Sequence, residues 1–154
     1  MKSTVRAFAA SLAIFMTGCV TTPTQDAMPS PTSSEFFQTL GGGFASHGNT
    51  VAYAVQVQPK KLVNASKPWF AQVEFENPLD RKNPLVKIIE FPTDQARFAL
   101  HSDFLAAIKN HKTYKVTLKA FSDPERTILI TTHEMDVRFD IPDELAATWG
   151  LKFL

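Results

Sequence analysis

The chain has 154 residues with 16 basic and 15 acidic side chains, and it contains a single cysteine. This near-neutral balance, without a long run of one sign, excludes the electrostatic footprint of a nucleic-acid-binding protein. One cysteine cannot form a disulfide within the chain, so a domain of this length must be held together by packing alone.

The first eighteen residues have the pattern of a secretory signal. Lys2 and Arg6 supply positive charge, and an apolar run of about ten residues follows at positions 7–16. A helix that spans a membrane needs roughly twenty residues, so this run is too short to remain as an anchor by itself.

The leader ends in Met16-Thr17-Gly18-Cys19, which resembles the lipobox of bacterial lipoproteins. That family usually has an aliphatic residue three places before the cysteine, and Met16 is a less common choice there. The resemblance implies cleavage after Gly18, diacylglycerol on the Cys19 thiol, and acylation of the new amino end by a chain such as palmitate. Three acyl chains exceed the two signals that stable anchoring requires. The alternative is an ordinary secretory signal with a chance cysteine.

The residue after the cysteine bears on which membrane holds the protein. In enteric members of the family an aspartate there often causes retention on the inner membrane, whereas this chain has Val20. The resemblance therefore implies the periplasmic face of the outer membrane, with the inner membrane as the alternative. Residues 1–18 contain two of the 16 basic residues, so the cleaved chain has 14 basic and 15 acidic residues, a net charge near −1.

Residues 19–46 are predicted to be a tether. Thr, Ser and Pro dominate up to Glu35, and such a segment cannot bury enough apolar surface to order itself. Phe36 and Phe37 then form an apolar patch, and the triple glycine at 41–43 is interpreted as a hinge. The predicted organisation is a signal peptide at 1–18, a tether at 19–46 and one domain at 47–154.

The domain shows the two-residue period of strands. Apolar and polar residues alternate over 50–58, 69–75 and 114–120, and two shorter apolar stretches occupy 85–91 and 96–100. The segment 126–141 changes the parity of its apolar positions, which predicts a bulge or a break near His133 and Glu134. Short helices are expected at 102–110, with Ser102 as cap, and at 142–150, with Gly150 as its end. About seven strands separated by turns predict a mainly β fold, an antiparallel Ig-like sandwich.

No combination of residues predicts catalysis, a metal site or a cofactor. The four histidines lack metal-ligand spacing, although His133, Glu134 and Met135 are residue types that could contribute to a copper site. The adjacent His101-Ser102-Asp103 has the residue types of a hydrolytic triad but not its assembly from separate segments. Glu74 and Glu76 share a strand face, as paired carboxylates do, but so does any solvated strand face.

The sequence favours a non-enzymatic protein-binding or envelope-assembly module, anchored in a membrane through its lipid and bound to an envelope protein. Exposed loops and the aromatic patch supply the candidate contacts, which are Phe36, Phe37, Asn77, Asp80 and Arg81. Pairing of a sheet edge with a partner strand is a second route. The alternative is a carrier of a lipid or other apolar ligand, because 13 phenylalanines could line a cavity. A hydrolase of envelope polymers is a third hypothesis.

Overall fold

The computed structural model describes residues 32–60, 69–91 and 97–154. These residues form seven strands and one helix: β1 (Phe37–His47), β2 (Thr50–Pro59), β3 (Trp69–Phe75), β4 (Leu85–Phe91), β5 (Phe98–His101), β6 (Lys112–Phe121), β7 (Leu129–Phe139) and α1 (Asp143–Trp149).

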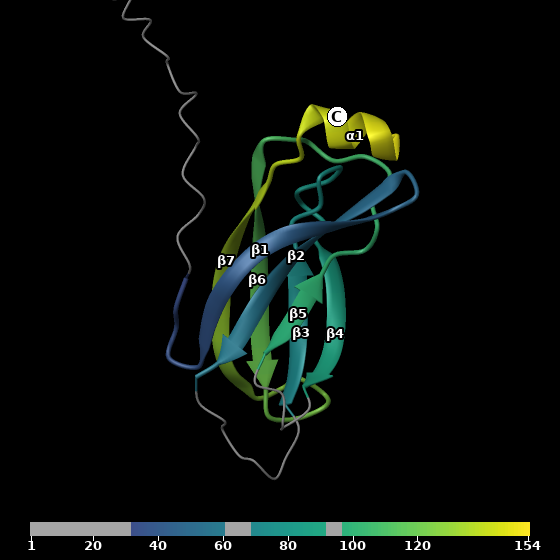
Figure 1. Cartoon of the computed structure of the whole chain (residues 1–154). Coiled ribbons are helices and arrows are strands. Elements are labelled where there is room, and N and C mark those ends of the chain that lie inside the picture. The colour runs from purple at the N-terminus through teal and green to yellow at the C-terminus, as the bar shows by residue number, and fades with distance from the viewer. Residues whose placement is uncertain (1–31, 61–68, 92–96) are drawn as a thin grey trace, which may run out of the picture.

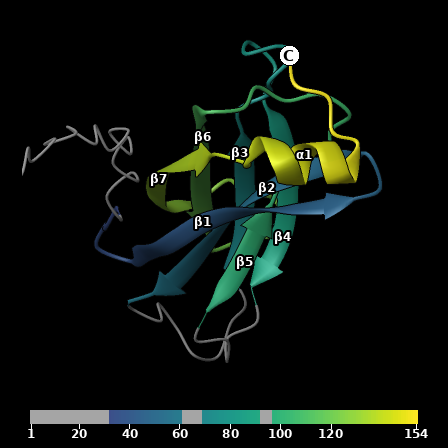
Figure 2. The same cartoon turned by 45° about the horizontal axis from the view of Figure 1, so that its top comes forward.

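The strands form two antiparallel sheets that pack face to face (Figures 1 and 2). Sheet A has three strands in the order β1-β2-β5, and sheet B has four in the order β4-β3-β6-β7. The β1–β2 hairpin runs obliquely across the strands of sheet B (Figure 1). The prediction of a mainly β antiparallel sandwich of about seven strands is therefore confirmed.

The core lies between the sheets because successive side chains of a strand point to opposite faces. Val55 of β2, Val73 of β3 and Leu118 of β6 all face inward and are fully buried. Tyr53 and Tyr114 stack across the core with their ring centroids 5.1 Å apart. Burial of such rows supplies the packing that a domain without disulfides requires.

The helix α1 closes one end of the sandwich (Figure 2). Trp149 in its last turn lies 5.9 Å from Phe44 of β1, measured between ring centroids. Gly150 ends the helix in the left-handed conformation, with its N–H directed at the carbonyls of Ala146 and Ala147. The prediction of a short helix that Gly150 terminates is confirmed.

The predicted boundary between tether and domain is wrong. Residues 37–46 belong to β1 and pair with β2, so the triple glycine at 41–43 is part of a sheet and not a hinge. A Cβ atom on Gly42 would lie 2.8 Å from Cγ1 of Val137 on β7, so this position has no room for a side chain. Residues 1–31, which include the expected leader and Cys19, lie outside the described residues.

The helix expected at 102–110 does not form. Instead Leu105 pairs with Val51, and Ile108 pairs with Phe153 near the end of the chain. Ser102 is buried, and its hydroxyl accepts a hydrogen bond from the Tyr53 N–H at 3.2 Å. Contacts with distant strands thus replace the local hydrogen bonds of a helix.

The bulge expected near His133 lies three residues earlier. Phe121 of β6 pairs with Leu129 and Ala120 pairs with Thr131, which leaves Ile130 as the extra residue on β7. His133 consequently belongs to the inward-facing row of β7 and is buried.

Candidate binding surface

The outer face of sheet B carries a group of charged side chains from β3, β6 and β7. On β3 the residues between the buried positions are Phe70, Gln72 and Glu74, and on β6 they include Lys115, Thr117 and Lys119. Antiparallel pairing brings Glu74 opposite Thr117 and Lys115 opposite Asp136 of β7. The strand period thus gathers acidic and basic side chains from three strands on one surface.

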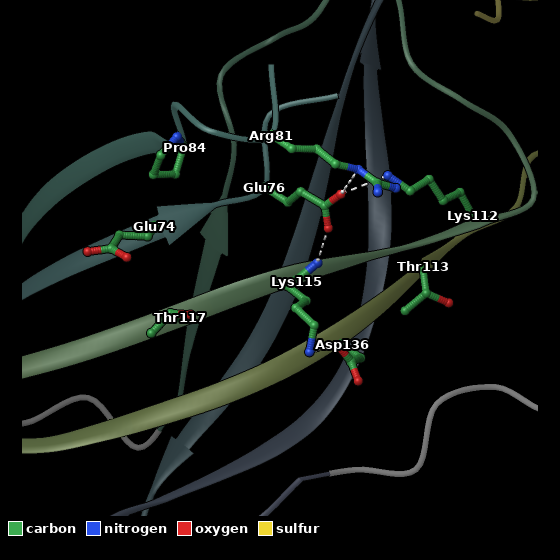
Figure 3. Close-up of a pocket in the computed structure, with 9 residues that line it drawn as sticks. All are labelled: Glu74, Glu76, Arg81, Pro84, Lys112, Thr113, Lys115, Thr117 and Asp136. Carbon is green, nitrogen blue, oxygen red and sulfur yellow. Dashed lines mark hydrogen bonds and ion pairs between the residues drawn. The ribbon is translucent and has the colours of Figure 1, made fainter. Parts of the chain in front are cut away.

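This face is hollowed into an open depression of about 630 Å³ (Figure 3). Three carboxylates, three cationic side chains and three neutral residues line it: Glu74, Glu76, Asp136, Arg81, Lys112, Lys115, Pro84, Thr113 and Thr117. We call this depression the charged hollow.

Glu76 is the organising residue of the charged hollow. Its Oε1 lies 3.1 Å from Nε of Arg81 and 2.7 Å from Nζ of Lys112, and its Oε2 accepts the Lys115 N–H at 3.2 Å. Figure 3 shows these three contacts converging on one carboxylate. Burial raises the pKa of Glu76, but the hydrogen bonds from Lys112 and Lys115 outweigh it, so the pKa is lowered.

Glu74 has a separate partner. Its Oε1 accepts hydrogen bonds from Nζ of Lys119 and, at 2.7 Å, from the amide of Gln72. The bond from Lys119 is the main reason why the pKa of Glu74 is lowered. Both glutamates are therefore ionised at neutral pH, and neither carries the proton that a general acid for glycan cleavage would need.

The charged groups of Arg81 and Lys115 are accessible to a group on a binding partner. Their side chains are 71% and 76% exposed, and the contact of Lys115 with Asp136 is a long one of 3.8 Å. Exposed ion pairs of this kind contribute little to stability. The arrangement suits the recognition of polar groups on a partner surface.

The three predicted contact residues in the loop at 77–84 lie together beside the charged hollow. Oδ1 of Asn77 accepts the Leu79 N–H at 3.0 Å, and Oδ1 of Asp80 accepts the Lys82 N–H at 3.0 Å. These bonds fix the loop in a turn that carries Arg81 to the rim. The side chain of Asn83 and the Lys82 N–H both donate to Asp80, and they lower the pKa of that carboxyl.

The two aromatic contact candidates lie elsewhere. Phe37 is fully buried, with its ring centroid 5.7 Å from that of Trp69, so its prediction as a partner contact is wrong. Phe36 is partly buried and lies 6.1 Å from the same ring. Phe37 starts β1 and faces the core, and the glycines after it concealed this strand from the alternation analysis.

Two aliphatic residues on the same outer face were not among the candidates. Val86 and Ile88 of β4 are 49% and 58% exposed, and they pair with Glu74 and Gln72 respectively. Five of the seven residues of 85–91 are apolar, and the two charged ones, Lys87 and Glu90, fall on opposite faces of the strand. The sequence therefore did not distinguish the two faces.

The residues considered for other chemistry are engaged in the fold. The Ser102 hydroxyl donates to the Asp103 carbonyl at 2.8 Å, while His101 Nδ1 lies 2.9 Å from the Ser102 carbonyl oxygen, so His101 does not face the hydroxyl it would have to activate. His133 Nε2 lies 3.0 Å from Oγ1 of Thr39. Within 32–60, 69–91 and 97–154, no three acidic, histidine or cysteine residues gather as a metal site.

The outer face of sheet A differs from that of sheet B. Its hollow of about 280 Å³ is lined only by neutral side chains, with Gly41, Gly43, Ala54 and Ala99 among them. Several phenylalanines pack in or against the core: Phe91 and Phe98, for example, have ring centroids 4.3 Å apart.

No helix in the described ranges is both long and apolar enough to cross a membrane. Comparison with known proteins adds no assignment, since no family model, no curated protein and no solved structure matches this chain.

Proposed function

We propose that this chain is a bacterial lipoprotein whose acylated Cys19 holds it on the periplasmic face of the outer membrane. The sandwich then serves as a non-enzymatic module that binds an envelope protein. The support for the anchor is the sequence of the leader, Met16-Thr17-Gly18-Cys19. The support for binding comes from the surface of sheet B.

The observation that carries the binding proposal is the composition of one face. The charged hollow, with Arg81 and Lys115 at its rim, lies on the same sheet face as the exposed Val86 and Ile88. Protein interfaces combine apolar contact area with polar groups that fix the orientation of the partner. Exposed aliphatic pairs on a sheet are otherwise a liability for a secreted domain.

The test is photo-crosslinking in cells that express the full chain. A photoreactive phenylalanine replaces Arg81 at the rim of the charged hollow, and in a matched strain it replaces Gln56, which is exposed on the outer face of sheet A. We expect a discrete adduct with one envelope protein from position 81 and none from position 56. In a Cys19→Ala background, where acylation cannot occur, the yield of that adduct should fall.

Equal patterns from positions 81 and 56 would contradict the proposal that sheet B is the binding face. A yield that is unchanged by Cys19→Ala would contradict the role of the anchor while leaving the binding face intact. The two parts of the proposal are thus tested separately.

A further inference from the structure

The strand β4 is a long open edge of sheet B. It has seven residues and pairs only with β3. Among the residues that the structure describes, no backbone group outside the ladder bonds to it. At the other edge of sheet B, β7 lies close to β1: the side chains of Thr39 and His133 are 3.0 Å apart, and Gly42 lies against Val137. The neighbouring edge β5 has only four residues.

The outward side of β4 carries two aliphatic residues and one acidic residue, Glu90. Val86 and Ile88 are about half exposed there, and their neighbours across the ladder are the polar Glu74 and Gln72. An added strand would place its own side chains directly beside Val86 and Ile88, at the spacing where apolar and β-branched pairs stabilise a sheet. The free N–H and C=O groups of the edge would supply the hydrogen bonds.

The inward side of β4 carries a charge. Lys87 faces the seam between the two sheets, and its Nζ lies 3.0 Å from Oδ1 of Asp103 and 3.3 Å from the Ser102 carbonyl oxygen. Its side chain is only 28% exposed. A lysine that points inward from an edge strand is a device by which proteins discourage unwanted pairing.

Lys87 disfavours a second copy of β4 as the added strand and favours a single strand from another protein. In a symmetric antiparallel pairing of two β4 strands over all seven residues, Ile88 meets Ile88 of the second copy and Lys87 lies opposite its Ile89. The two Lys87 side chains then occupy diagonal positions on the same inner face, where like charges repel. A lone strand brings no second lysine, and an acidic residue on it would gain an ion pair with Lys87.

We propose that β4 binds a single extended segment of a partner protein, which adds a fifth strand to sheet B. The segment has apolar or β-branched residues at two alternate positions, for Val86 and Ile88, and an acidic residue between them, for Lys87. This inference rests on the proposed function, because it names the kind of partner segment that the binding face accepts.

The test uses the full acylated chain in cells and two substitutions of matched exposure. Ile88→Lys places a charge on the outer side of β4. Ile128→Lys is the control, since Ile128 is 60% exposed against 58% for Ile88 and lies in the β6–β7 turn. We expect Ile88→Lys to lower the adduct yield from position 81 about fivefold or more and Ile128→Lys to leave it within about twofold. Unfolding midpoints of the purified variants serve as the folding control.

A second crosslinking probe identifies the partner segment directly. A photoreactive phenylalanine replaces Glu90, which is exposed near the end of β4, and mass spectrometry identifies the attached peptide. A peptide with apolar residues flanking an acidic one supports the proposal. An adduct with β4 of a second copy overturns it, as does an undiminished position-81 adduct in a folded Ile88→Lys variant. If Ile88→Lys folds but leaves the position-81 adduct undiminished, the proposed function still stands. If no adduct forms from position 81 at all, both the proposed function and this inference are refuted.

Discussion

At the scale of single residues, Gly42 is the clearest constraint on the sandwich. A Cβ there would meet Cγ1 of Val137 at 2.8 Å and the Ala54 carbonyl oxygen at 3.3 Å, so Gly42→Ala must push β1 away from β7. We expect a loss of about 1–3 kcal/mol in the free energy of unfolding, as for other overpacked cores. Urea denaturation of the purified chain measures it.

The control for this prediction is the next glycine. Gly43 has nothing within 4 Å of its hypothetical Cβ, so Gly43→Ala should leave the urea midpoint unchanged or raise it slightly. Equal losses for both variants would show that β1 does not approach β7 as described.

We expect His133 to make the stability of the fold depend on pH. It is 2% exposed, and burial, helped by the charge of Lys60, lowers its pKa below the ordinary value of 6.5. As the pH falls through 6.5, His133 takes up a proton in the unfolded chain but stays neutral in the folded chain. The free energy of unfolding therefore decreases on acidification. The free energy of unfolding should therefore decrease between pH 7.5 and pH 5.5.

The comparison with His133→Gln isolates this effect. Glutamine keeps a polar group near Thr39 but cannot titrate, so the variant should lose less stability than the natural chain over the same pH interval. Glu74 and Glu76 do not interfere, because their lowered pKa values place their contribution at more acidic pH. Identical pH profiles for the two proteins would rule out His133 as the titrating group.

A residue's role could be predicted from the sequence where it depends on neighbouring residues, and could not where it depends on the pairing of distant strands. Asn77, Asp80 and Arg81 follow a strand and form a polar turn, and their exposure is a local property that the sequence reveals. The contacts of Glu76 with Lys112 and Lys115 depend on β3 pairing with β6. Because that pairing joins segments separated by two other strands, β4 and β5, the alternation of either strand alone does not indicate it.

At the scale of elements, the strands were predictable where polar and apolar residues alternate and were missed where another factor overrides that pattern. In β1 the close approach to β7 requires glycine, which removes the alternation. The segment 102–110 has a local helical pattern, but buried Ile108 and its pairing with Phe153 hold it extended. In both cases a tertiary contact outweighs the local preference.

A hydrogen bond between the two sheets leads to a further prediction at the scale of elements. Tyr53 of β2 is buried, and its hydroxyl donates to the Glu76 carbonyl at 2.5 Å, which connects sheet A to the end of β3. Burial raises the pKa of Tyr53, so the hydroxyl remains a donor throughout the neutral range. Tyr53→Phe should cost about 1–2 kcal/mol, because it leaves that carbonyl without its partner.

Chemical denaturation of Tyr53→Phe beside the natural chain provides the measurement. The ring and its stacking on Tyr114 remain in the variant, so the difference reports on the hydroxyl alone. An unchanged midpoint would mean that the hydrogen bond to Glu76 contributes no net stability.

At the scale of the whole molecule, the class of fold followed from the number of alternating segments and the turns between them. The order of strands in the sheets did not, because several pairings satisfy the same pattern of apolar residues. Sheet order is nevertheless what matters for binding, since it makes β4 an edge and gathers the charged hollow on one face. The sequence therefore indicated Asn77, Asp80 and Arg81 as contacts, but not the surface on which strand pairing places them beside Glu76 and Lys115.

The central claim about the whole molecule is that an N-terminal lipid holds this sandwich at a membrane. Metabolic labelling with an alkyne-tagged palmitate, followed by mass spectrometry of the amino-terminal peptide, tests it directly in cells that express the full chain. We predict a chain that begins at Cys19, carries the label there and sediments with membranes, with all three properties absent from Cys19→Ala. A chain that retains residues 1–18, or one that is cleaved but unlabelled, would contradict the account.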